Sequence, residues 1–441
     1  MKIVLVERTS DSAVNKDQMG GYGINTQVGE SFFARWIMRQ KKVLRNIPIL
    51  SLGYMASIFS KGGHEIEVMH GDKIPQGDLF ILASSIVDYK SELRRASEIK
   101  KKYPEAKIGF IGPFAGYLTD EYLKFGDFII KGEPEHAAME ISKGFIPKGV
   151  VDSPSLQELD KLPFPKWDFF DISNYYYSPS IRKKPFLSMQ SSRGCAFACN
   201  YCPYLTYQKN WRARSPENVI EEIKYLKDRF KIKGLLFRDP LFTLDKERSR
   251  QIAEGMIKNK FNLEWACETR TDLLDESLID SMYKAGLKAI NLGIESARQD
   301  LLDKASRKAV DIKRQERIIR YCEKKGIKII AFYLLGLPDD TVQTIKETVS
   351  YAKKLNTFLA QFHILTPFPG TEFYRRIKKL ITEPDWEKFN SFTPVVRNKN
   401  MSKETLKNLK EWAFLNYYFR FSYIRKQFKH LVQLWRKFLP F

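Results

Sequence analysis

The first 150 residues alternate short apolar runs with longer segments of helical periodicity. Runs rich in Val, Ile, Leu and Phe predict strands at residues 2–6, 64–72, 78–85, 107–112 and 125–133. Helical patterns lie between them, at residues 47–63, 91–106 and 136–145. This alternation is typical of a doubly wound parallel sheet with helices on both faces. Ligands of such folds bind at the carboxyl ends of the strands, here the loops after Val6, Ala83 and Ile111.

A second alternation begins at Pro185 and predicts a second α/β unit. Its expected strands span residues 185–192, 234–239, 263–270, 288–296, 328–338 and 360–367. Its expected helices span residues 215–230, 245–259, 275–286, 311–326 and 339–355, and each opens on a Ser or Asp that suits an N-cap. Six strand–helix units in a row predict a partial (β/α)6 barrel of the TIM type, with its chemistry at the C-terminal strand ends.

These patterns divide the chain into four regions. Residues 1–150 form the first α/β domain and residues 185–375 the barrel. Between them, residues 151–184 contain four prolines and many aromatics, which predicts an irregular linker. Residues 376–441 form a C-terminal helical region.

The end of the chain is basic and aromatic. An apolar stripe at helical spacing predicts one amphipathic helix through Leu406, Leu409, Ala413, Tyr417, Phe421, Ile424, Phe428, Leu431 and Trp435. No acidic residue follows Glu411, whereas several Lys and Arg do. Three interpretations remain open: packing against the barrel, contact with an anionic membrane surface, or nucleic-acid binding.

The composition of the chain restricts the partners and the cellular compartment that we expect for it. The chain has 74 Lys and Arg against 52 Asp and Glu, a net charge of +22, which fits either an anionic partner or a lysine-rich solvated surface. Five cysteines in 441 residues are too few for a secreted disulfide framework, so a reducing cytoplasm is expected. No apolar stretch is long enough for a membrane-spanning helix, and the apolar start is short, as in a strand.

Three of the five cysteines stand together at Cys195, Cys199 and Cys202, in the stretch SSRGCAFACNYC. Thiolates are soft ligands for iron or zinc, and three within eight residues can surround one metal centre. A structural zinc site normally has a fourth Cys or His, and none lies close in sequence. A three-ligand site leaves one coordination position open, and it follows a strand end, where a barrel carries its active site.

This spacing, with an aromatic at Tyr201, resembles the signature of radical S-adenosylmethionine (SAM) enzymes. The resemblance implies a 4Fe–4S cluster on the three cysteines, SAM on the open iron, and reductive cleavage to a 5′-deoxyadenosyl radical. It implies that Tyr201 packs near the adenine, and it makes Arg270, Glu295 and Ser296 candidates for the SAM carboxylate and ribose. Asp239 becomes a candidate for the amino group or the substrate. Gly336 and Pro338 are expected in a turn that approaches the ligand.

The first domain is similar to the cobalamin-binding domain that precedes many radical SAM enzymes, including methyltransferases, the anaerobic magnesium-protoporphyrin ester cyclase and enzymes that modify hopanoids. The resemblance places cobalamin against Gly20, Gly21, Gly23, Ser84, Ser85 and Gly112. The motif whose His binds cobalt from below is absent here, and Pro113 removes a backbone donor after Gly112. The alternative is a domain of this shape without the cofactor.

The leading hypothesis is therefore a radical SAM enzyme that modifies a hydrophobic small molecule, such as an isoprenoid lipid or tetrapyrrole. The reaction is cobalamin-dependent methylation, or cyclisation or C–C bond formation. A flavodoxin or ferredoxin is the expected electron donor, and the enzyme is cytoplasmic or peripheral at a membrane. Two alternatives stay open: a membrane-associated scaffold with structural zinc, and a radical SAM enzyme that acts on RNA or peptide. Nucleic acid is disfavoured because the methylthiolating relatives that modify transfer RNA carry cysteines in their first domain, and this one has none.

Overall fold

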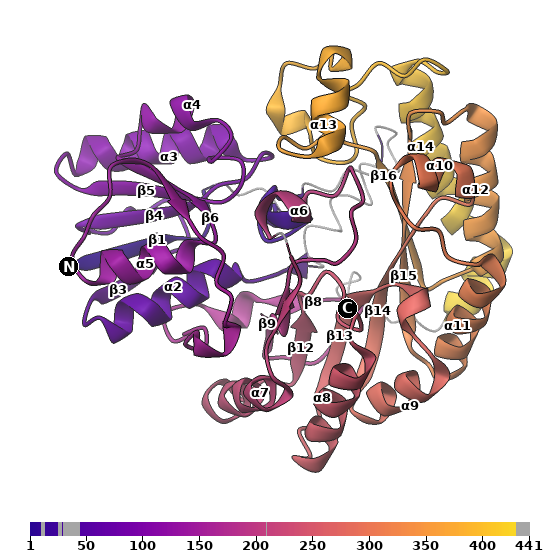
Figure 1. The fold of residues 1–441 in the computed structure, drawn as a ribbon, viewed down its shortest axis with the longest axis horizontal. Coiled ribbons are helices and arrows are strands. Elements are labelled where there is room, and N and C mark those ends of the chain that lie inside the picture. The colour runs from indigo at the N-terminus through magenta and orange to yellow at the C-terminus, as the bar shows by residue number, and fades with distance from the viewer. Residues whose placement is uncertain (10–13, 25–28, 30–44, 209, 429–441) are drawn as a thin grey trace, which may run out of the picture.

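The computed structural model describes residues 1–9, 14–24, 29, 45–208 and 210–428. The protein has two lobes, each built on a parallel sheet (Figure 1). Between the lobes, the short helix α6 (Tyr204–Tyr207) packs on the 3-10 turn η1 (Met19–Gly21). The two segments come from different lobes, so the two halves meet through loops that follow their first strands.

The N-terminal lobe is a doubly wound sheet of six parallel strands within the described residues, in the order β3-β1-β4-β5-β6-β7. Its strands are β1 (Lys2–Val6), β3 (Glu65–Met69), β4 (Leu79–Ala83), β5 (Lys107–Ile111), β6 (Phe128–Gly132) and β7 (Gly149–Ser153). Helices α2 (Leu50–Lys61) and α5 (Pro134–Ser142) cover one face, and α3 (Tyr89–Lys102) and α4 (Thr119–Leu123) cover the other (Figure 1). Because both faces are covered, Ile3 to Val6 are all fully buried.

The sequence pattern missed β7. Its residues alternate partly buried and exposed positions at the sheet edge, so they lack the continuous apolar run of the central strands. β7 extends the first sheet to Ser153, and the four-region division of the chain remains a prediction.

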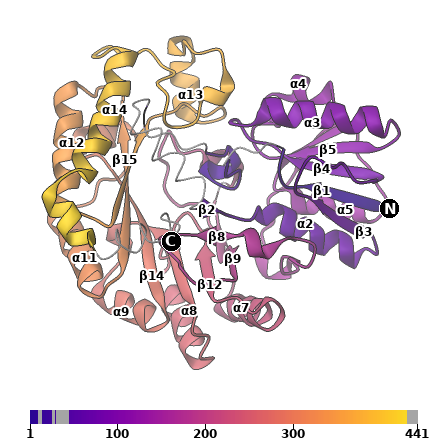
Figure 2. The same ribbon diagram turned by 180° about the vertical axis from the view of Figure 1, so that it is seen from behind.

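The second lobe is an open, curved sheet of six parallel strands in the described chain, in the order β16-β15-β14-β13-β12-β9. Its strands are β9 (Phe186–Met189), β12 (Gly234–Phe237), β13 (Glu264–Thr269), β14 (Leu287–Glu295), β15 (Lys328–Leu335) and β16 (Leu359–Ile364). β9 and β16 are its two edges, so the barrel is partial, as expected. Around its outer side lie α7 (Pro216–Phe230), α8 (Lys246–Lys258), α9 (Glu276–Lys284), α11 (Ile312–Lys324) and α12 (Val342–Leu355) (Figure 2).

Capping side chains start these outer helices where the sequence placed them. Ser215, Asp245, Asp275 and Asp311 each accept a hydrogen bond from a backbone N–H of the following turn. The fifth helix, α12, begins later than expected, because Thr341 forms its cap with Thr344. A further short helix, α10 (Gln299–Lys304), was not predicted.

Several short elements complete the chain. They are the antiparallel pairs β2 (Arg45–Asn46) with β8 (Tyr176–Tyr177) and β10 (Ser192–Arg193) with β11 (Arg212–Ala213), the 3-10 turns η2 (Leu159–Lys161), η3 (Ile172–Asn174), η4 (Thr271–Leu273), η5 (Lys378–Leu380) and η6 (Trp386–Lys388), and helix α13 (Glu372–Ile377). In the described residues, no helix combines the length and apolarity needed to cross a membrane.

The single tail helix predicted from the apolar stripe is wrong. Helix α14 (Lys403–Tyr418) buries Leu406, Leu409, Ala413 and Tyr417 against α12 and β16, but the helix ends there. Residues 421–428 form a second helical segment with a different buried face. Phe421, Ile424 and Phe428 are 80%, 41% and 61% exposed, whereas Tyr423 and Gln427 are buried. Leu431 and Trp435 of the predicted stripe lie outside the described part of the chain.

Candidate active site

The three cysteines lie on the loop that leaves strand β9. Gly194 begins this loop with a φ of +78°, a conformation that suits glycine. Cys195, Cys199 and Cys202 all line one cavity of about 270 Å³ at the carboxyl ends of the barrel strands. Burial raises the pKa of the Cys195 thiol and raises that of Cys202 to about 12, so a bound metal is what would favour their thiolate forms.

Among the described residues, no three His, Cys, Asp or Glu side chains converge closely enough to hold a single metal ion. An iron–sulfur cube differs from a single ion because each thiolate binds its own iron, so the sulfurs need not meet at one point. Three thiols on one wall of the cavity fit such a cube and leave its fourth iron to another ligand.

Tyr201, Arg270 and Glu295 also line this cavity, and their expected contacts with SAM stay predictions. The Arg270 guanidinium lies 4.3 Å from the centre of the Phe197 ring and is fixed by two hydrogen bonds of 2.9 Å to Asp272. Its Nη1 atom is buried without a partner in the described chain. A buried guanidinium with an unused donor is suited to bind a carboxylate ligand.

A second cation, which the sequence analysis missed, faces the cluster loop. Arg307 donates to the Gly293 carbonyl at 2.6 Å, lies 3.4 Å from Glu295 and approaches the Cys199 Sγ at 4.0 Å. Burial raises the pKa of Glu295, although Arg307 and Arg270 act in the opposite direction. Glu295 also has a φ of +68°, so strained backbone holds its carboxyl group at the cavity wall.

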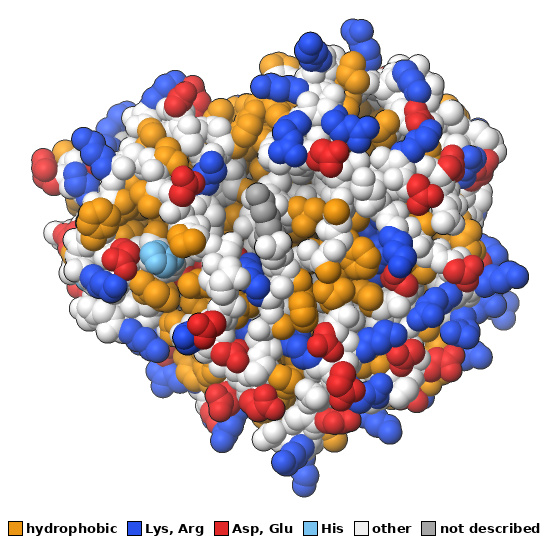
Figure 3. Space-filling model, viewed as in Figure 1, with side chains coloured by type: hydrophobic (Ala, Val, Ile, Leu, Met, Phe, Trp, Pro, Cys, Tyr) orange, Lys and Arg blue, Asp and Glu red, His pale blue; other side chains and the backbone are white. Residues whose placement is uncertain are grey.

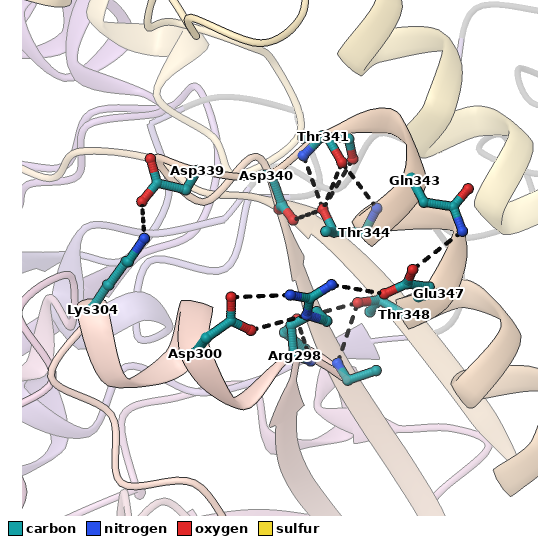
Figure 4. Close-up of polar contacts among 12 residues, drawn as sticks. Arg298, Asp300, Lys304, Asp339, Asp340, Thr341, Gln343, Thr344, Glu347 and Thr348 are labelled. Atoms are coloured by element: carbon teal, nitrogen blue, oxygen red, sulfur yellow. Dashed lines mark hydrogen bonds and ion pairs between the residues drawn. The ribbon is translucent and has the colours of Figure 1, made fainter.

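Asp239 and Ser296 do not line the cavity. Asp239 is fully buried and accepts hydrogen bonds from the backbone and hydroxyl of Ser191 and the hydroxyl of Ser192, so it fixes the start of the cysteine loop. The Ser296 hydroxyl lies 3.2 Å from that of Thr348. Figure 4 shows Thr348 within the polar network that joins α10 to α12 at the barrel rim, in which Arg298 contacts Asp300 and Glu347.

The turn that contains Gly336 and Pro338 also lies away from the cavity. Asp340 fixes it by accepting hydrogen bonds from the backbone of Gly336 and Leu337, and a nearby ion pair joins Lys304 to Asp339 (Figure 4). Gly336 has a φ of +82°, and a Cβ there would lie 2.7 Å from Leu406 of α14. The glycine therefore permits a tight turn under α14 rather than an approach to the ligand.

A second, smaller cavity of about 70 Å³ lies where the carboxyl ends of the N-terminal strands face the barrel lobe. Gly20, Gly21, Ser84 and Gly112 line it. A Cβ on Gly20 would lie 2.8 Å from the Pro203 backbone, so glycine permits close contact with the cysteine loop. Gly23 and Ser85 lie outside the cavity lining, and Ser85 donates to Glu92 instead.

Arg238 and Tyr204 line both cavities and form part of the wall between them. Arg238 donates to the backbone oxygen of Asp17 at 2.6 Å, to the Tyr204 hydroxyl at 3.4 Å and to the Glu268 carboxylate. One guanidinium therefore joins the loop after β1, the cysteine loop and strand β13. The sequence alone marked Arg238 only as part of a strand end.

Buried ion pairs join the cysteine loop to the N-terminal lobe. Arg193, two residues before Cys195, contacts Glu133 at 3.0 Å and Glu135 at 2.6 Å. Arg212 of β11 also binds Glu133. The glutamates stand at the start of α5, so the N-terminal lobe directly positions the loop that carries the cysteines.

Comparisons with known proteins agree with this geometry. Residues 189–352 match the family model of the radical SAM superfamily. The chain is 28% identical over 410 residues to an uncharacterized methyltransferase of Pyrococcus horikoshii, covering 85% of this chain and 88% of that protein. It is 29% identical over 255 residues to the anaerobic magnesium-protoporphyrin IX monomethyl ester cyclase of Rubrivivax gelatinosus, covering 57% of this chain and 45% of the cyclase.

A solved structure shares the fold of both lobes. The radical S-adenosylmethionine methyltransferase TsrM of Kitasatospora setae, solved with cobalamin and a [4Fe-4S] cluster, has a TM-score of 0.65 and 16% identity, covering 93% of this chain and 85% of that chain. The cysteine loop at the barrel strand ends and the family match lead to one conclusion: residues 189–352 form a radical SAM domain, within a two-lobe fold that this chain shares with TsrM.

Proposed function

We propose that this enzyme is a cobalamin-dependent radical SAM methyltransferase that acts on a hydrophobic small molecule. The observation that carries the proposal is the pair of cavities that share Arg238 and Tyr204. One cavity holds the three cysteines, and the other lies at the ligand-binding edge of the N-terminal sheet. A substrate in the large cavity would lie within reach of groups bound on either side of this wall.

Cys195, Cys199 and Cys202 would hold the 4Fe–4S cluster, and reductive cleavage of SAM is the chemistry that such a centre supplies when bound. The unused Nη1 of Arg270 and the guanidinium of Arg307 are suited to bind the SAM carboxylate. Glu295 is placed to accept a hydrogen bond from a ribose hydroxyl, and Tyr201 lies beside Cys202 to pack on the adenine. An external donor such as a flavodoxin or ferredoxin would supply the electron.

Gly20, Gly21, Ser84 and Gly112 would contact the corrin, with Glu135 and Arg193 on the same cavity wall. Methyl transfer is the chemistry that cobalamin supplies when bound. The cavity of about 70 Å³ has room for a side group at the edge of the corrin. Glu135 contributes to it a carboxylate oxygen that has no hydrogen-bond partner among the described residues.

Part of the large cavity's wall is apolar. Phe332, Leu334, Leu365 and Phe368 line it, together with the buried amide of Asn291. These side chains favour a hydrophobic body with a polar group, as in an isoprenoid lipid or a tetrapyrrole. The cyclase relative is named for a tetrapyrrole ester, which supports this substrate class.

The exposed face of residues 421–428 supports a peripheral membrane contact, where hydrophobic substrates are found. Phe421 and Phe428 are exposed on the same segment as Arg425, a combination that suits an anionic lipid surface. On the face in Figure 3, Lys and Arg side chains are interspersed with Asp and Glu over both lobes.

The test is purification without oxygen, followed by assays of iron, sulfide and bound corrinoid. We expect about four irons per chain for a single cube, 5′-deoxyadenosine on reduction with SAM, and corrin uptake from hydroxocobalamin. Iron without corrin uptake would contradict the methyltransferase proposal and leave a radical SAM cyclase or other C–C bond-forming enzyme. A protein that holds zinc and no iron after reconstitution would contradict the whole proposal.

A further inference from the structure

A group of exposed cations lies on the short helix α13 and the turn that follows it, at residues 372–380. The group, which we call the α13 patch, consists of Arg375, Arg376, Lys378 and Lys379. The acidic residue of this range, Glu372, lies 3.8 Å from Arg376, whereas the other three cations pair with no acidic side chain of the described residues. Figure 3 shows several Lys and Arg side chains over α13, with few Asp and Glu among them.

The α13 patch lies next to the loop that carries the cysteines. The backbone N–H of Phe373 in α13 donates to the carbonyl of Asn200, the residue after Cys199, at 2.9 Å. The Phe373 side chain belongs to a small buried apolar cluster on which Tyr201 also packs. The inner side of α13 is therefore fixed on the cysteine loop, and the cations of its outer side face solvent across one short helix.

A second segment that contacts the cysteine loop adds to this charge. The Asn200 side chain donates to the carbonyl of Lys304, at the end of α10, at 3.3 Å. The side chains of Lys304 and Lys308 are exposed, as is that of Asp303. Lys304 pairs with Asp339, whereas Lys308 pairs with no acidic side chain in the described part of the chain. Both segments that bind Asn200 therefore present more cations than acids to solvent.

The composition of the α13 patch distinguishes between anionic partners. A membrane contact needs an apolar face beside the cations, and Leu380 is the exposed large hydrophobic residue of the range 372–380. A nucleic-acid strand stacks its bases on exposed aromatics, whereas Phe373 and Tyr374 are buried. An acidic protein needs only complementary charge, and weak electron-transfer complexes have small interfaces that charge attraction helps to form. The position beside the cysteine loop favours such a complex.

We propose that the α13 patch is the docking surface for a small acidic electron carrier that reduces the iron–sulfur centre. The inference rests on the proposed function, because it requires that centre on the three cysteines. One electron is transferred: the carrier loses it, the iron–sulfur centre gains it, and no bond is made or broken. Docking depends on the patch and not on the cluster, so the two can be tested separately.

The experiment measures the affinity of the reconstituted full chain for two probes, an oxidised bacterial flavodoxin and a bacterial 4Fe–4S ferredoxin, by isothermal titration calorimetry. The patch variant combines Arg375→Gln, Lys378→Gln and Lys379→Gln. A matched control combines Arg317→Gln, Lys284→Gln and Lys324→Gln, at exposed positions of the outer helices α9 and α11. Each variant removes one Arg and two Lys charges. A further variant, Arg375→Lys with Lys378→Arg and Lys379→Arg, keeps the charge of the patch.

We expect the wild type to bind at least one carrier, with an affinity that falls as salt rises from about 0.05 M to about 0.3 M. The patch variant should bind about tenfold more weakly, as expected for the loss of three exposed charge pairs. The control and the charge-keeping variant should bind like the wild type, and circular dichroism melts check the fold. Equal affinities of the wild type and the patch variant would overturn the inference, and so would an equal loss in the control. A wild type that binds neither carrier, but binds RNA or anionic vesicles through the patch, would overturn it too.

The rate of cluster reduction gives a second readout. In stopped-flow mixing, reduced flavodoxin should reduce the cluster of the patch variant about tenfold more slowly than that of the wild type, in proportion to the lost affinity. Reduced methyl viologen, a small cationic dye that needs no docking surface, should reduce the variant at least as fast as the wild type. Equal slowing with the dye would show that the variant damages the cluster, which would contradict a docking role. A chain that takes up no iron would overturn the proposed function, whereas an intact cluster with unchanged carrier affinity would overturn this inference alone.

Discussion

Three arginines surround the cysteine loop, and each is held by a different element. Arg193 is fixed by the glutamates of α5, Arg270 by Asp272, and Arg307 by the carbonyl of Gly293. A reduced cluster and a SAM carboxylate both carry negative charge, so buried cations at these places would stabilise the proposed loaded site. Individual residues can therefore be tested for separate roles in cluster assembly and in SAM binding.

Cys199→Ala should abolish the iron–sulfur absorbance and reduce 5′-deoxyadenosine formation to background, because the cluster loses one of three protein ligands. Cys322→Ala is the matched control, since Cys322 is buried in α11 and does not line the cavity. It should retain full iron content. A Cys199→Ala protein that still cleaves SAM would disprove the assigned ligands.

Arg307→Gln should weaken SAM binding about ten- to hundredfold, because a hydrogen bond to a charged group contributes about 1.5 to 3 kcal/mol. Iron content should not change. SAM affinity can be followed by the change in cluster spectra on titration. Arg320→Gln, an exposed residue of α11, serves as control. If both variants bind SAM equally well, Arg307 has no part in the site.

At this scale the sequence revealed the cysteines and, by resemblance, Tyr201, Arg270 and Glu295. It did not reveal Arg193, Arg238, Arg307 or Glu135. Their roles depend on contacts between residues that lie far apart in the chain, such as Arg193 with Glu135. Asp239 and Ser296 stand at strand ends, where ligands bind. In this structure, however, their side chains form hydrogen bonds with hydroxyl groups of the protein.

Among the elements, the helical segment at residues 421–428 departs most from the sequence pattern. Its apolar spacing continues that of α14, but the helix is interrupted at Phe419 and Arg420. There the Arg420 side chain donates to the carbonyls of Tyr417 and Lys353. The segment after the break buries Tyr423 instead and turns Phe421 and Phe428 outward. The single apolar stripe of the sequence therefore corresponds to two helix faces in the structure, one packed against the protein and one exposed to solvent.

Replacing both Phe421 and Phe428 by Ser should reduce partitioning onto phosphatidylglycerol vesicles about tenfold per side chain, as expected from the lost apolar burial. Co-sedimentation measures the bound fraction. Tyr283→Ser changes an exposed aromatic on α9 and should have no effect. Partitioning that survives in the double variant would show that this face is not the membrane contact. Equal binding to phosphatidylcholine vesicles would show that the anionic charge of the lipid does not contribute to binding.

Central strands and capped helices were predictable because their signals are local. A fully buried parallel strand is a continuous apolar run, as in β4, and a helix start is marked by its cap, as in α7. The edge strand β7 and the six-residue helix α10 were missed because neither buries a continuous face.

At the scale of the whole molecule, the loop after β1 is one of the segments that join the two lobes. Asp17 and Tyr22 of this loop reach the barrel lobe, where they contact Arg238 and the carbonyl of Pro369. Gly20 and Gly21 of the same loop line the small cavity. One short segment therefore contributes both to the contact between the lobes and to the lining of both cavities.

Asp17 also gives the molecule a specific pH response. Burial raises its pKa to about 6, although Arg238 opposes the shift. Because the folded protein binds this proton more tightly than the unfolded chain, the contribution of Asp17 to stability is full below about pH 4 and is lost as pH rises through 6. Relative to the wild type, Asp17→Asn should gain about 1 to 3 kcal/mol in free energy of unfolding between pH 4.5 and 7.5. Urea unfolding measures this difference, and a constant difference across the range would refute the shifted pKa.

The segment at residues 14–24 contacts both lobes: Lys16 pairs with Asp88 and Glu92 of the N-terminal lobe, and Asp17 binds Arg238 of the barrel lobe. A chimera that joins this barrel to the N-terminal lobe of a relative would therefore place a foreign segment against one of the two lobes. Functional exchange of lobes, in engineering as in evolution, requires this segment to stay compatible with both of its neighbours.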